Sequence, residues 1–197
     1  MKKSRIPVWV AILAAIGVSA AFAQAPVQKR PEPGNKPIEI FKAFAVQMQS
    51  GKAGAVEIAI TRWSTDEERQ RLLNVLKEQG QPAMIADLQK LPQVGYIKTP
   101  TSMGVALFYA RSNELPDGAR QVVIGTDRAI GVSANAPTLS QYDATVIELH
   151  FPKGGGKGEG KIVLAGKASV GNDGKVQISN YSGEPVRLKD VTASTPK

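Results

Sequence analysis

The sequence predicts an α+β fold: a predominantly antiparallel β-sheet, closed as a barrel or folded as a sandwich, with a two-helix insertion between its second and third strands. Apolar and polar residues alternate with a period of two along most of residues 38–191. Only residues 64–91 switch to helical spacing. Because short turns rich in Gly, Asp and Pro join successive strands, antiparallel pairing is expected.

A β-hairpin is predicted at the start of this region. Residues 38–48 (IEIFKAFAVQM) and 55–63 (AVEIAITRW) both alternate, and the turn-like QSGKAG lies between them. In the second strand, Val56, Ile58 and Ile60 share one side, as the period of a half-buried strand requires.

Two helices follow the hairpin. Ser64 precedes Glu67 by three residues and Thr65 precedes Glu68 by three, which gives two overlapping capping-box candidates, and Gly80 is a natural C-terminal stop. The second helix is expected to begin at Pro82 and end before Pro92, with one apolar face made of Met84, Ile85, Leu88 and Leu91. The apolar faces of the two helices are expected to pack against the sheet.

The remainder of the chain is expected to return to strands. They are predicted in residues 94–99, 103–111, 120–126, 144–151, 158–168, 175–179 and 184–191, with an irregular crossing segment over residues 126–143. The strongly apolar segment 103–111 is expected to be a central strand. The turn LPDG at residues 115–118 should pair it with residues 120–126.

The N-terminus has the pattern of a secretory signal peptide. Lys2, Lys3 and Arg5 precede an apolar run over residues 8–21, which is short for a membrane span, and AFA at residues 21–23 is a typical cleavage sequence. Residues 1–23 are therefore expected to be removed, leaving a periplasmic or extracellular protein without a stable membrane span. An uncleaved N-terminal anchor is the alternative.

Composition divides the chain into four segments. After the signal peptide, residues 24–37 form a Pro-rich flexible linker with hardly any apolar side chains. Residues 38–191 are expected to fold as a single α+β domain, and residues 192–197 to form a polar tail.

Charge and cysteine content limit the classes of partner. The chain has a net charge of +8, but three of its cations lie in the predicted signal peptide, so the mature chain carries a surplus of five. These cations are scattered, without the dense basic patch that nucleic-acid binding requires, so no nucleic-acid partner is expected. Weak attraction to anionic envelope surfaces is compatible with the surplus. No cysteine is present to form disulfides or thiolate sites, and no cofactor is predicted.

The glycine-rich stretch KGGGKGEGK (residues 153–161) contains the skeleton of a phosphate-binding loop. However, Ile162 follows Lys161 where such a loop has Ser or Thr, and the next residues are typical of a strand and not a helix. A hairpin loop over residues 152–157 is predicted instead.

Charge pairing predicts the register of that hairpin. With Glu148 opposite Lys161, His150 lies opposite Glu159, and each charge has an opposite or titratable partner. A two-residue slip sets Glu148 against Glu159 or His150 against Lys161, which like-charge repulsion disfavours.

Two groups of residues are candidate sites. Glu148, His150 and Glu159 offer a histidine and two carboxylates for a divalent metal, although a solvated polar face is the favoured interpretation. Asp127 and Arg128, at the end of a strand, could bind a ligand or simply stabilise a turn. No catalytic residue is identified. No serine lies in a G-x-S-x-G motif, and no carboxylate pair can be recognised from sequence.

The segments GYIKTP, GTDR and GKGEGK, within residues 44–191, resemble a group of exported bacterial proteins of unknown function. The resemblance implies an exported bacterial address and no activity. We therefore expect a non-catalytic ligand-binding or envelope-associated domain, with a small molecule, lipid or envelope component as partner, bound in a cavity or on a sheet face. A secreted hydrolase using an unrecognised carboxylate pair is the alternative.

Overall fold

The computed structural model describes residues 36–48, 51–128, 130, 144–171, 176–181 and 185–196. The predicted signal peptide (residues 1–23) and residues 24–35 of the predicted linker lie outside the described residues. Most of the predicted crossing segment also lies outside them.

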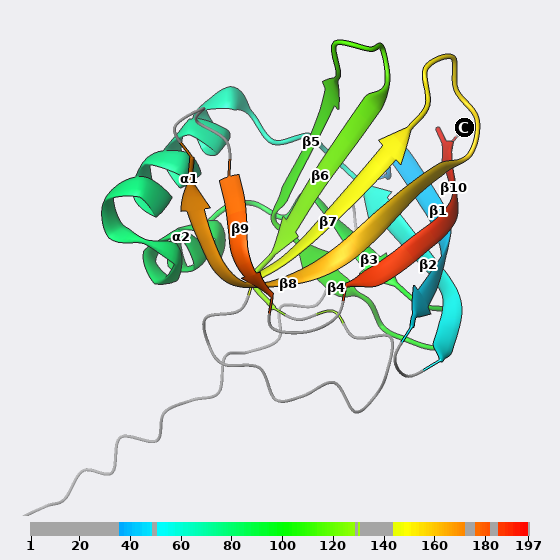
Figure 1. Cartoon of the computed structure of the whole chain (residues 1–197), viewed down its shortest axis with the longest axis horizontal. Helices are drawn as coiled ribbons and strands as arrows, with labels where there is room; N and C mark the ends of the chain where they lie inside the picture. The colour runs from blue at the N-terminus through cyan, green and yellow to red at the C-terminus, as the bar shows by residue number, and fades with distance from the viewer. Residues whose placement is uncertain are drawn as a thin grey trace, which may run out of the picture.

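Ten strands form one antiparallel sheet in the order β4-β3-β2-β1-β10-β8-β7-β6-β5, with β9 paired to β8 (Figure 1). Two helices lie between β2 and β3, so the predicted α+β class and the position of the helical insertion are confirmed. The elements are β1 (Glu39–Gln47), β2 (Lys52–Ile60), α1 (Asp66–Gln79), α2 (Gln81–Leu88), β3 (Gly95–Lys98), β4 (Val105–Leu107), β5 (Tyr109–Glu114), β6 (Arg120–Thr126), β7 (Ala144–Phe151), β8 (Gly158–Val170), β9 (Val176–Tyr181) and β10 (Val186–Ser194).

The sheet nearly closes into a barrel through β4 and β5. These strands occupy the two ends of the strand order, yet they follow one another in the chain, with only Phe108 between them. The Phe108 amide donates to the Gly125 carbonyl at 3.0 Å, and the Thr126 hydroxyl donates to the Ala106 carbonyl at 2.8 Å. The prediction of one central strand over residues 103–111 is therefore wrong. The segment changes its pairing partner from β3 to β6 at Phe108, which interrupts the ladder.

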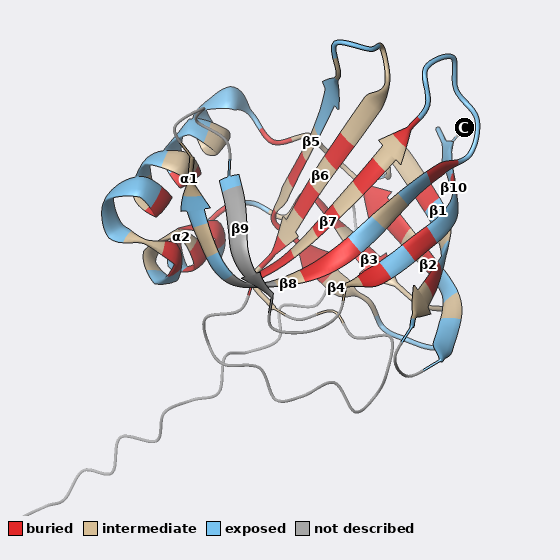
Figure 2. Ribbon diagram, in the orientation of Figure 1, coloured by how far each residue is buried: buried red, intermediate tan, exposed pale blue. Residues whose placement is uncertain are grey.

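Apolar side chains fill the interior of the barrel. Figure 2 shows buried positions recurring along the strands of the barrel wall, as their period-two pattern predicts. The largest fully buried side chains of this core are Phe41, Ile58, Ile60, Leu107, Ile124, Ile147, Leu149, Leu188, Val94, Val122 and Val191.

A partly buried ion pair between Arg120 and Glu39 covers one end of this core, where β6 begins and β7 ends. Arg120 donates two hydrogen bonds of 2.7 Å to the carboxylate of Glu39. Its guanidinium also lies 5.8–5.9 Å from the ring centres of Phe41, Trp63 and Phe151. We call this group of five residues the Arg120 cap. It closes the end of the barrel with an arginine that contacts aromatic rings below it and a carboxylate beside it.

The start of α1 confirms one of the two predicted capping boxes. The Thr65 side chain accepts from the Glu68 amide while the Glu68 carboxylate accepts from the Thr65 amide. Ser64 has a different role, because its hydroxyl accepts from the Ala110 amide and so joins the helix entrance to β5. Helix α1 ends at Gly80, as predicted.

The helical pair covers the closing segment of the sheet. Leu72, Leu88 and Leu91 pack with Ala106 and Phe108 in a second apolar core. Arg71 of α1 also forms a two-bond ion pair with the nearly buried Asp87 of α2. Helix α2 ends at Leu88, three residues earlier than its apolar pattern suggested, although Leu91 still packs in the same core.

Strand β8 is long enough to leave the barrel. Its first part pairs with β7 and β10, and its last part pairs with β9 beside the helices (Figure 1). There the Ala168 amide donates to the side-chain oxygen of Gln81, at the start of α2, at 2.5 Å. A helix residue thus accepts a backbone hydrogen bond from β8 beyond Ala165, where the pairing of β8 with β7 ends.

The predicted polar tail, residues 192–197, begins as part of the sheet. Strand β10 extends to Ser194, because residues 192–194 pair with residues 40–42 of β1. Pairing with β1 keeps this segment extended even though most of its side chains are polar.

The two predicted hairpins in the second half of the barrel are confirmed, and so is the predicted register of the second one. Strands β5 and β6 pair across a turn in which the Gly118 amide donates to the Leu115 carbonyl at 2.8 Å. In the β7–β8 pair, Glu148 lies opposite Lys161 and His150 opposite Glu159, as charge pairing predicts.

Substituting Gly160 should test how closely β7 and β8 approach. A Cβ atom at Gly160 would lie 2.5 Å from the Glu148 carbonyl oxygen, so Gly160→Ala should lower the free energy of unfolding by about 1–3 kcal/mol. Gly54→Ala in β2, where a Cβ would meet no atom within 4 Å, is the matched control. Urea unfolding measures both, and equal effects would contradict the close approach.

Removing the cation of the Arg120 cap should destabilise the barrel. Arg120→Met leaves the half-buried Glu39 carboxylate without its partner, so we expect a loss of about 2–3 kcal/mol in urea unfolding. Arg111→Met is the matched control. Its partner Asp66 is largely exposed, so the loss should stay below about 1 kcal/mol. Similar losses in the two variants would show that the cap has no special role.

Candidate ligand-binding site

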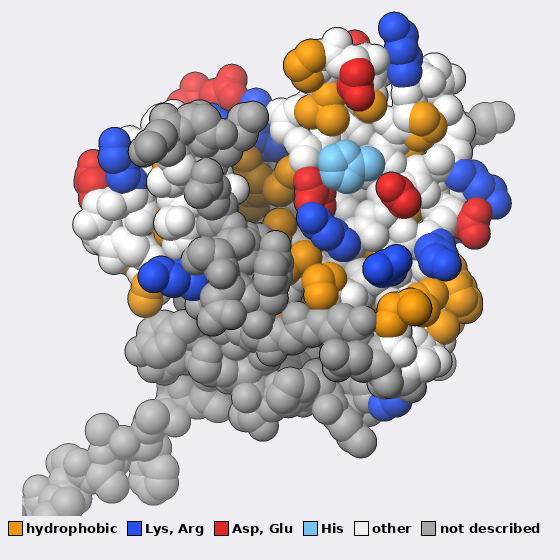
Figure 3. Space-filling view, viewed as in Figure 1, with side chains coloured by type: hydrophobic (Ala, Val, Ile, Leu, Met, Phe, Trp, Pro, Cys, Tyr) orange, Lys and Arg blue, Asp and Glu red, His pale blue; other side chains and the backbone are white. Residues whose placement is uncertain are grey.

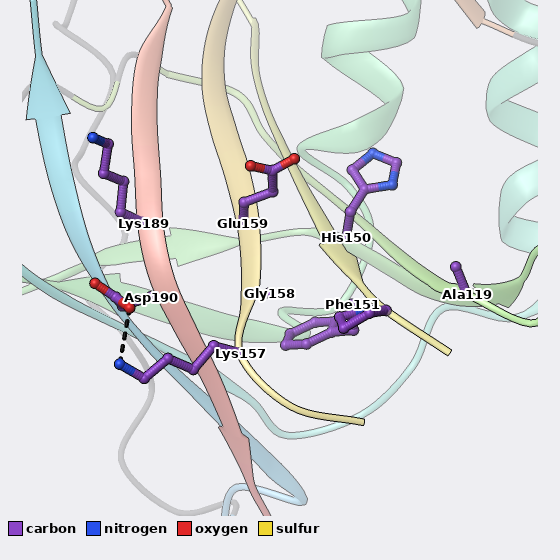
Figure 4. A pocket seen from close by; sticks show the side chains of 9 residues that line it. Ala119, His150, Phe151, Lys157, Gly158, Glu159, Lys189 and Asp190 are labelled. Atoms are coloured by element: carbon purple, nitrogen blue, oxygen red, sulfur yellow. Dashed lines mark hydrogen bonds and ion pairs between the residues drawn. The ribbon is translucent and has the colours of Figure 1, made fainter. Parts of the chain in front are cut away.

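An open hollow of about 630 Å³ lies on the outer surface of the barrel, at the β7–β8 loop (Figure 4). We call it the β7–β8 hollow. Three elements supply most of its lining: the end of β7 with its loop, the start of β8, and β10. The lining residues are Ala119, His150, Phe151, Pro152, Lys157, Gly158, Glu159, Lys189 and Asp190.

A β-bulge in β10 forms one wall of the hollow. Lys189 and Asp190 together occupy the position opposite Glu159, since Leu188 pairs with Gly160 and Val191 with Gly158. Asp190 has a positive φ of 51°, which places the extra residue in the left-handed region. The bulge turns two consecutive charged side chains outward while Leu188 and Val191 stay in the core.

The glycine-rich loop forms the hairpin that was predicted and has no phosphate-loop geometry. Strand β7 precedes it and strand β8 follows it, so no helix N-terminus faces the loop. Gly154, Gly155 and Gly156 all have positive φ, which explains three successive glycines. Gly160 is required by the close approach of β7, and the motif therefore has a structural origin.

Of the charged side chains of the hollow, Lys157 and Asp190 form an ion pair with each other, whereas Glu159 and Lys189 form none with the residues that the structure describes. Lys157 binds Asp190 at 2.8 Å, and both side chains are about two-thirds exposed, so this pair adds little stability and can open to a ligand. Its hydrogen bond and charge lower the pKa of Asp190. Within the described part of the chain, Glu159 and Lys189 form no ion pair. Figure 4 shows both side chains extending from their strands without a partner among the residues drawn.

His150 connects the hollow to a neighbouring polar network on the outer face. Its Nε2 lies 3.0 Å from Glu148 Oε1, while Glu148 Oε2 lies 3.0 Å from the Lys161 ammonium. Gln121 also donates to Glu148 at 2.5 Å. Burial alone would raise the pKa of Glu148, but the hydrogen bonds from Lys161, His150 and Gln121 outweigh it and lower the pKa.

The predicted metal candidates Glu148, His150 and Glu159 meet only in part. His150 contacts Glu148 and lies opposite Glu159, but a lysine and a glutamine already occupy the Glu148 carboxylate. Among the described residues, no group of three His, Asp or Glu side chains lies close enough to hold a metal ion. The donor set therefore fits a hydrogen-bonded network better than a metal centre.

Asp127 and Arg128, the other candidates, bind each other. The Arg128 Nε–H donates to Asp127 Oδ1 at 3.0 Å, and Asp127 also accepts from Gln89 of the segment after α2. Neither residue lines the β7–β8 hollow. Their geometry agrees with a role in stabilising the end of β6.

A smaller hollow of about 400 Å³ lies at the entrance of α1, between Trp63 and Ser112. Its acidic residues Asp66 and Glu67 belong to the first helical turn, and Asp66 is bound by Arg111 at 2.5 Å. Because its charges are largely engaged in the helix entrance, this hollow is the weaker candidate.

The residues that sequence reasoning missed are those of β10. Within RLKDV, the apolar residues Leu188 and Val191 are three positions apart instead of two. That change of phase is the signal of a bulge, and it could have placed Lys189 and Asp190 on the same face.

Comparison of the chain with protein-family models, with curated proteins and with solved structures gives no match. In the part of the chain that the structure describes, neither helix is long and apolar enough to cross a membrane.

The network around Glu148 should make the free energy of unfolding fall as the pH is lowered. A carboxyl whose pKa is lowered by folding stabilises the fold above its unfolded pKa, and this stabilisation is lost as the pH falls through the folded pKa. Glu148→Gln should therefore flatten the fall in unfolding free energy between about pH 5 and 3. Glu78→Gln on the exposed side of α1 is the control. An unchanged pH profile in Glu148→Gln would contradict the network.

Proposed function

We propose that the protein is an exported, non-catalytic binding domain that holds a small polar ligand or envelope component in the β7–β8 hollow. Two observations together support this proposal. Apolar side chains fill the interior of the barrel, and an open hollow on its outer surface contains charged side chains that form no ion pair with any other described residue. Since core side chains occupy the barrel, the expected internal ligand cavity has no support. We therefore place binding on the outer face of the sheet, in the β7–β8 hollow.

The lining of the hollow favours a ligand with several polar groups. Lys189 and Lys157 can donate to a carboxylate or phosphate, while Glu159 can accept from hydroxyl or amino groups. Phe151 and Pro152 add apolar surface, as binding sites for small molecules usually do. We infer an acidic ligand that also carries hydroxyl or amino groups, such as a fragment of an envelope glycan.

The exported address rests on the sequence. The basic, apolar and small-residue regions of residues 1–23 match a signal peptide, and the cysteine-free composition is compatible with an envelope location. The β7–β8 hollow and the surplus of positive charge suit a compartment with abundant acidic glycans and lipids.

A secreted hydrolase is the competing function, because the hollow contains two carboxylates, Glu159 and Asp190. A glycosidase needs one carboxyl with a raised pKa as general acid. Lys157 lowers the pKa of Asp190, which is the opposite of that requirement. Asp190 therefore does not fit the general-acid role, and the proposal of binding rests on the open hollow and its exposed charges.

The test combines retained-ligand detection with a charge-removing variant. Native mass spectrometry of the exported protein should show a bound small molecule, and ligand-observed NMR with amino-sugar acids and sugar phosphates should show binding. Glu159→Gln should weaken binding about tenfold or more, because a charged hydrogen bond contributes about 1.5–3 kcal/mol. Glu114→Gln, an exposed change at the end of β5, should have no effect.

Two results would overturn the proposal. Protein free of ligand that also binds none of these compounds at millimolar concentration would exclude the hollow as a binding site. Turnover of a glycoside or ester that Glu159→Gln abolishes would assign the hollow to a hydrolase.

A further inference from the structure

The outer face of β1 and β10 carries two cations beside an exposed phenylalanine and a partly buried valine. Phe44 lies opposite Lys189 and Val46 opposite Arg187, while the intervening pair of Ala45 and Leu188 is buried. Alternation along the strands therefore turns these four side chains outward together. We call Phe44, Val46, Arg187 and Lys189 the β1–β10 face.

The cations of this face stay available to a partner, although Lys189 lies near the Asp190 carboxylate. Over the described ranges of the chain, neither Arg187 nor Lys189 forms an ion pair. Arg187 lies opposite another cation, Lys161, which is itself held by Glu148. Two basic residues in directly opposite positions repel each other. The Arg187–Lys161 pair therefore adds to the positive charge beside this face.

The apolar part of the face is partly open to solvent: Phe44 is exposed and Val46 is partly buried. Phe44 is 49% exposed and Met48, just beyond β1, is 56% exposed. Neighbouring β2 presents the small side chains of Ala55 and Ala53 opposite Phe44 and Val46, which leaves Phe44 exposed. Figure 3 shows basic side chains near β8 and β10 next to a group of hydrophobic side chains on the same side of the molecule.

We infer that the β1–β10 face docks on the surface of an anionic phospholipid bilayer. Arg187 and Lys189 would contact lipid phosphates, while Phe44 and Val46 would enter the boundary between headgroups and acyl chains. A soluble polyanion would use the cations but would gain nothing from an exposed phenylalanine, which favours a lipid surface. Docking goes beyond the proposed function, because it requires no ligand in the β7–β8 hollow.

Vesicle cosedimentation of the full chain tests this inference. We expect binding to phosphatidylglycerol vesicles that is much stronger than binding to phosphatidylcholine vesicles and that weakens as salt is raised. Residues 8–21 are apolar and can bind both lipids, so phosphatidylcholine measures that contribution.

Variants then assign the binding to the face. Arg187→Gln with Lys189→Gln should weaken phosphatidylglycerol binding about tenfold or more, given the contribution of each basic residue near an anionic surface. The matched control, Lys77→Gln in α1 with Lys90→Gln just after α2, removes the same charge and should have a much smaller effect. Phe44→Ser should weaken binding severalfold and Phe44→Trp should retain it, with circular dichroism confirming that each variant folds.

Three outcomes would overturn the inference. Equal losses in the two double variants would show that only net charge matters. Wild-type binding by Phe44→Ser, with equal binding to a soluble polyanion such as heparin, would assign the face to polyanions. Concentration-dependent dimerisation in sedimentation, abolished by Phe44→Ser, would assign it to a second copy of the chain. Binding in the hollow is measured separately through Glu159, so each proposal can fail alone.

Discussion

The closure of the sheet between β4 and β5 is the constraint on which the rest of the structure depends. Because these two strands follow one another in the chain and lie at opposite ends of the strand order, one change of pairing at Phe108 brings both ends of the sheet together. Hydrogen bonds from Phe108 and Thr126 hold the junction. The helical pair packs over Phe108 and Ala106, so the insertion between β2 and β3 covers the place where closure leaves the ladder incomplete.

Closure also decides where a ligand can bind. A small barrel has an interior that side chains can fill, and here apolar side chains from the barrel strands fill it while the Arg120 cap covers one end. The charged groups that could contact a ligand are then left to the outer surface. There, alternation along β7, β8 and β10 presents His150, Glu159 and Lys189, and the β7–β8 loop adds Lys157. The hollow is a consequence of strand ends and a bulge, not of a gap in the core.

The features that were predicted correctly depend on short-range patterns in the sequence. The period of two, the turn at residues 115–118, the Thr65 capping box and the Glu148–Lys161 register all depend on residues near one another in the chain or on one hairpin. The Arg120–Glu39 pair joins residues 81 positions apart, and no pattern in the sequence connects them. The break at Phe108 was missed for a related reason: an apolar run does not show that its two halves pair with different strands.

The bulge in β10 explains how one strand serves both the hollow and the β1–β10 face. Strict alternation after Leu188 would turn Lys189 outward, Asp190 inward and Val191 outward. The extra residue instead returns Val191 to the core and leaves both charged residues outside. Lys189 therefore stands between the hollow, where it is near Asp190, and the face, where it lies opposite Phe44. A bilayer that engaged the face would also hold the hollow close to the lipid headgroups, because the two share Lys189.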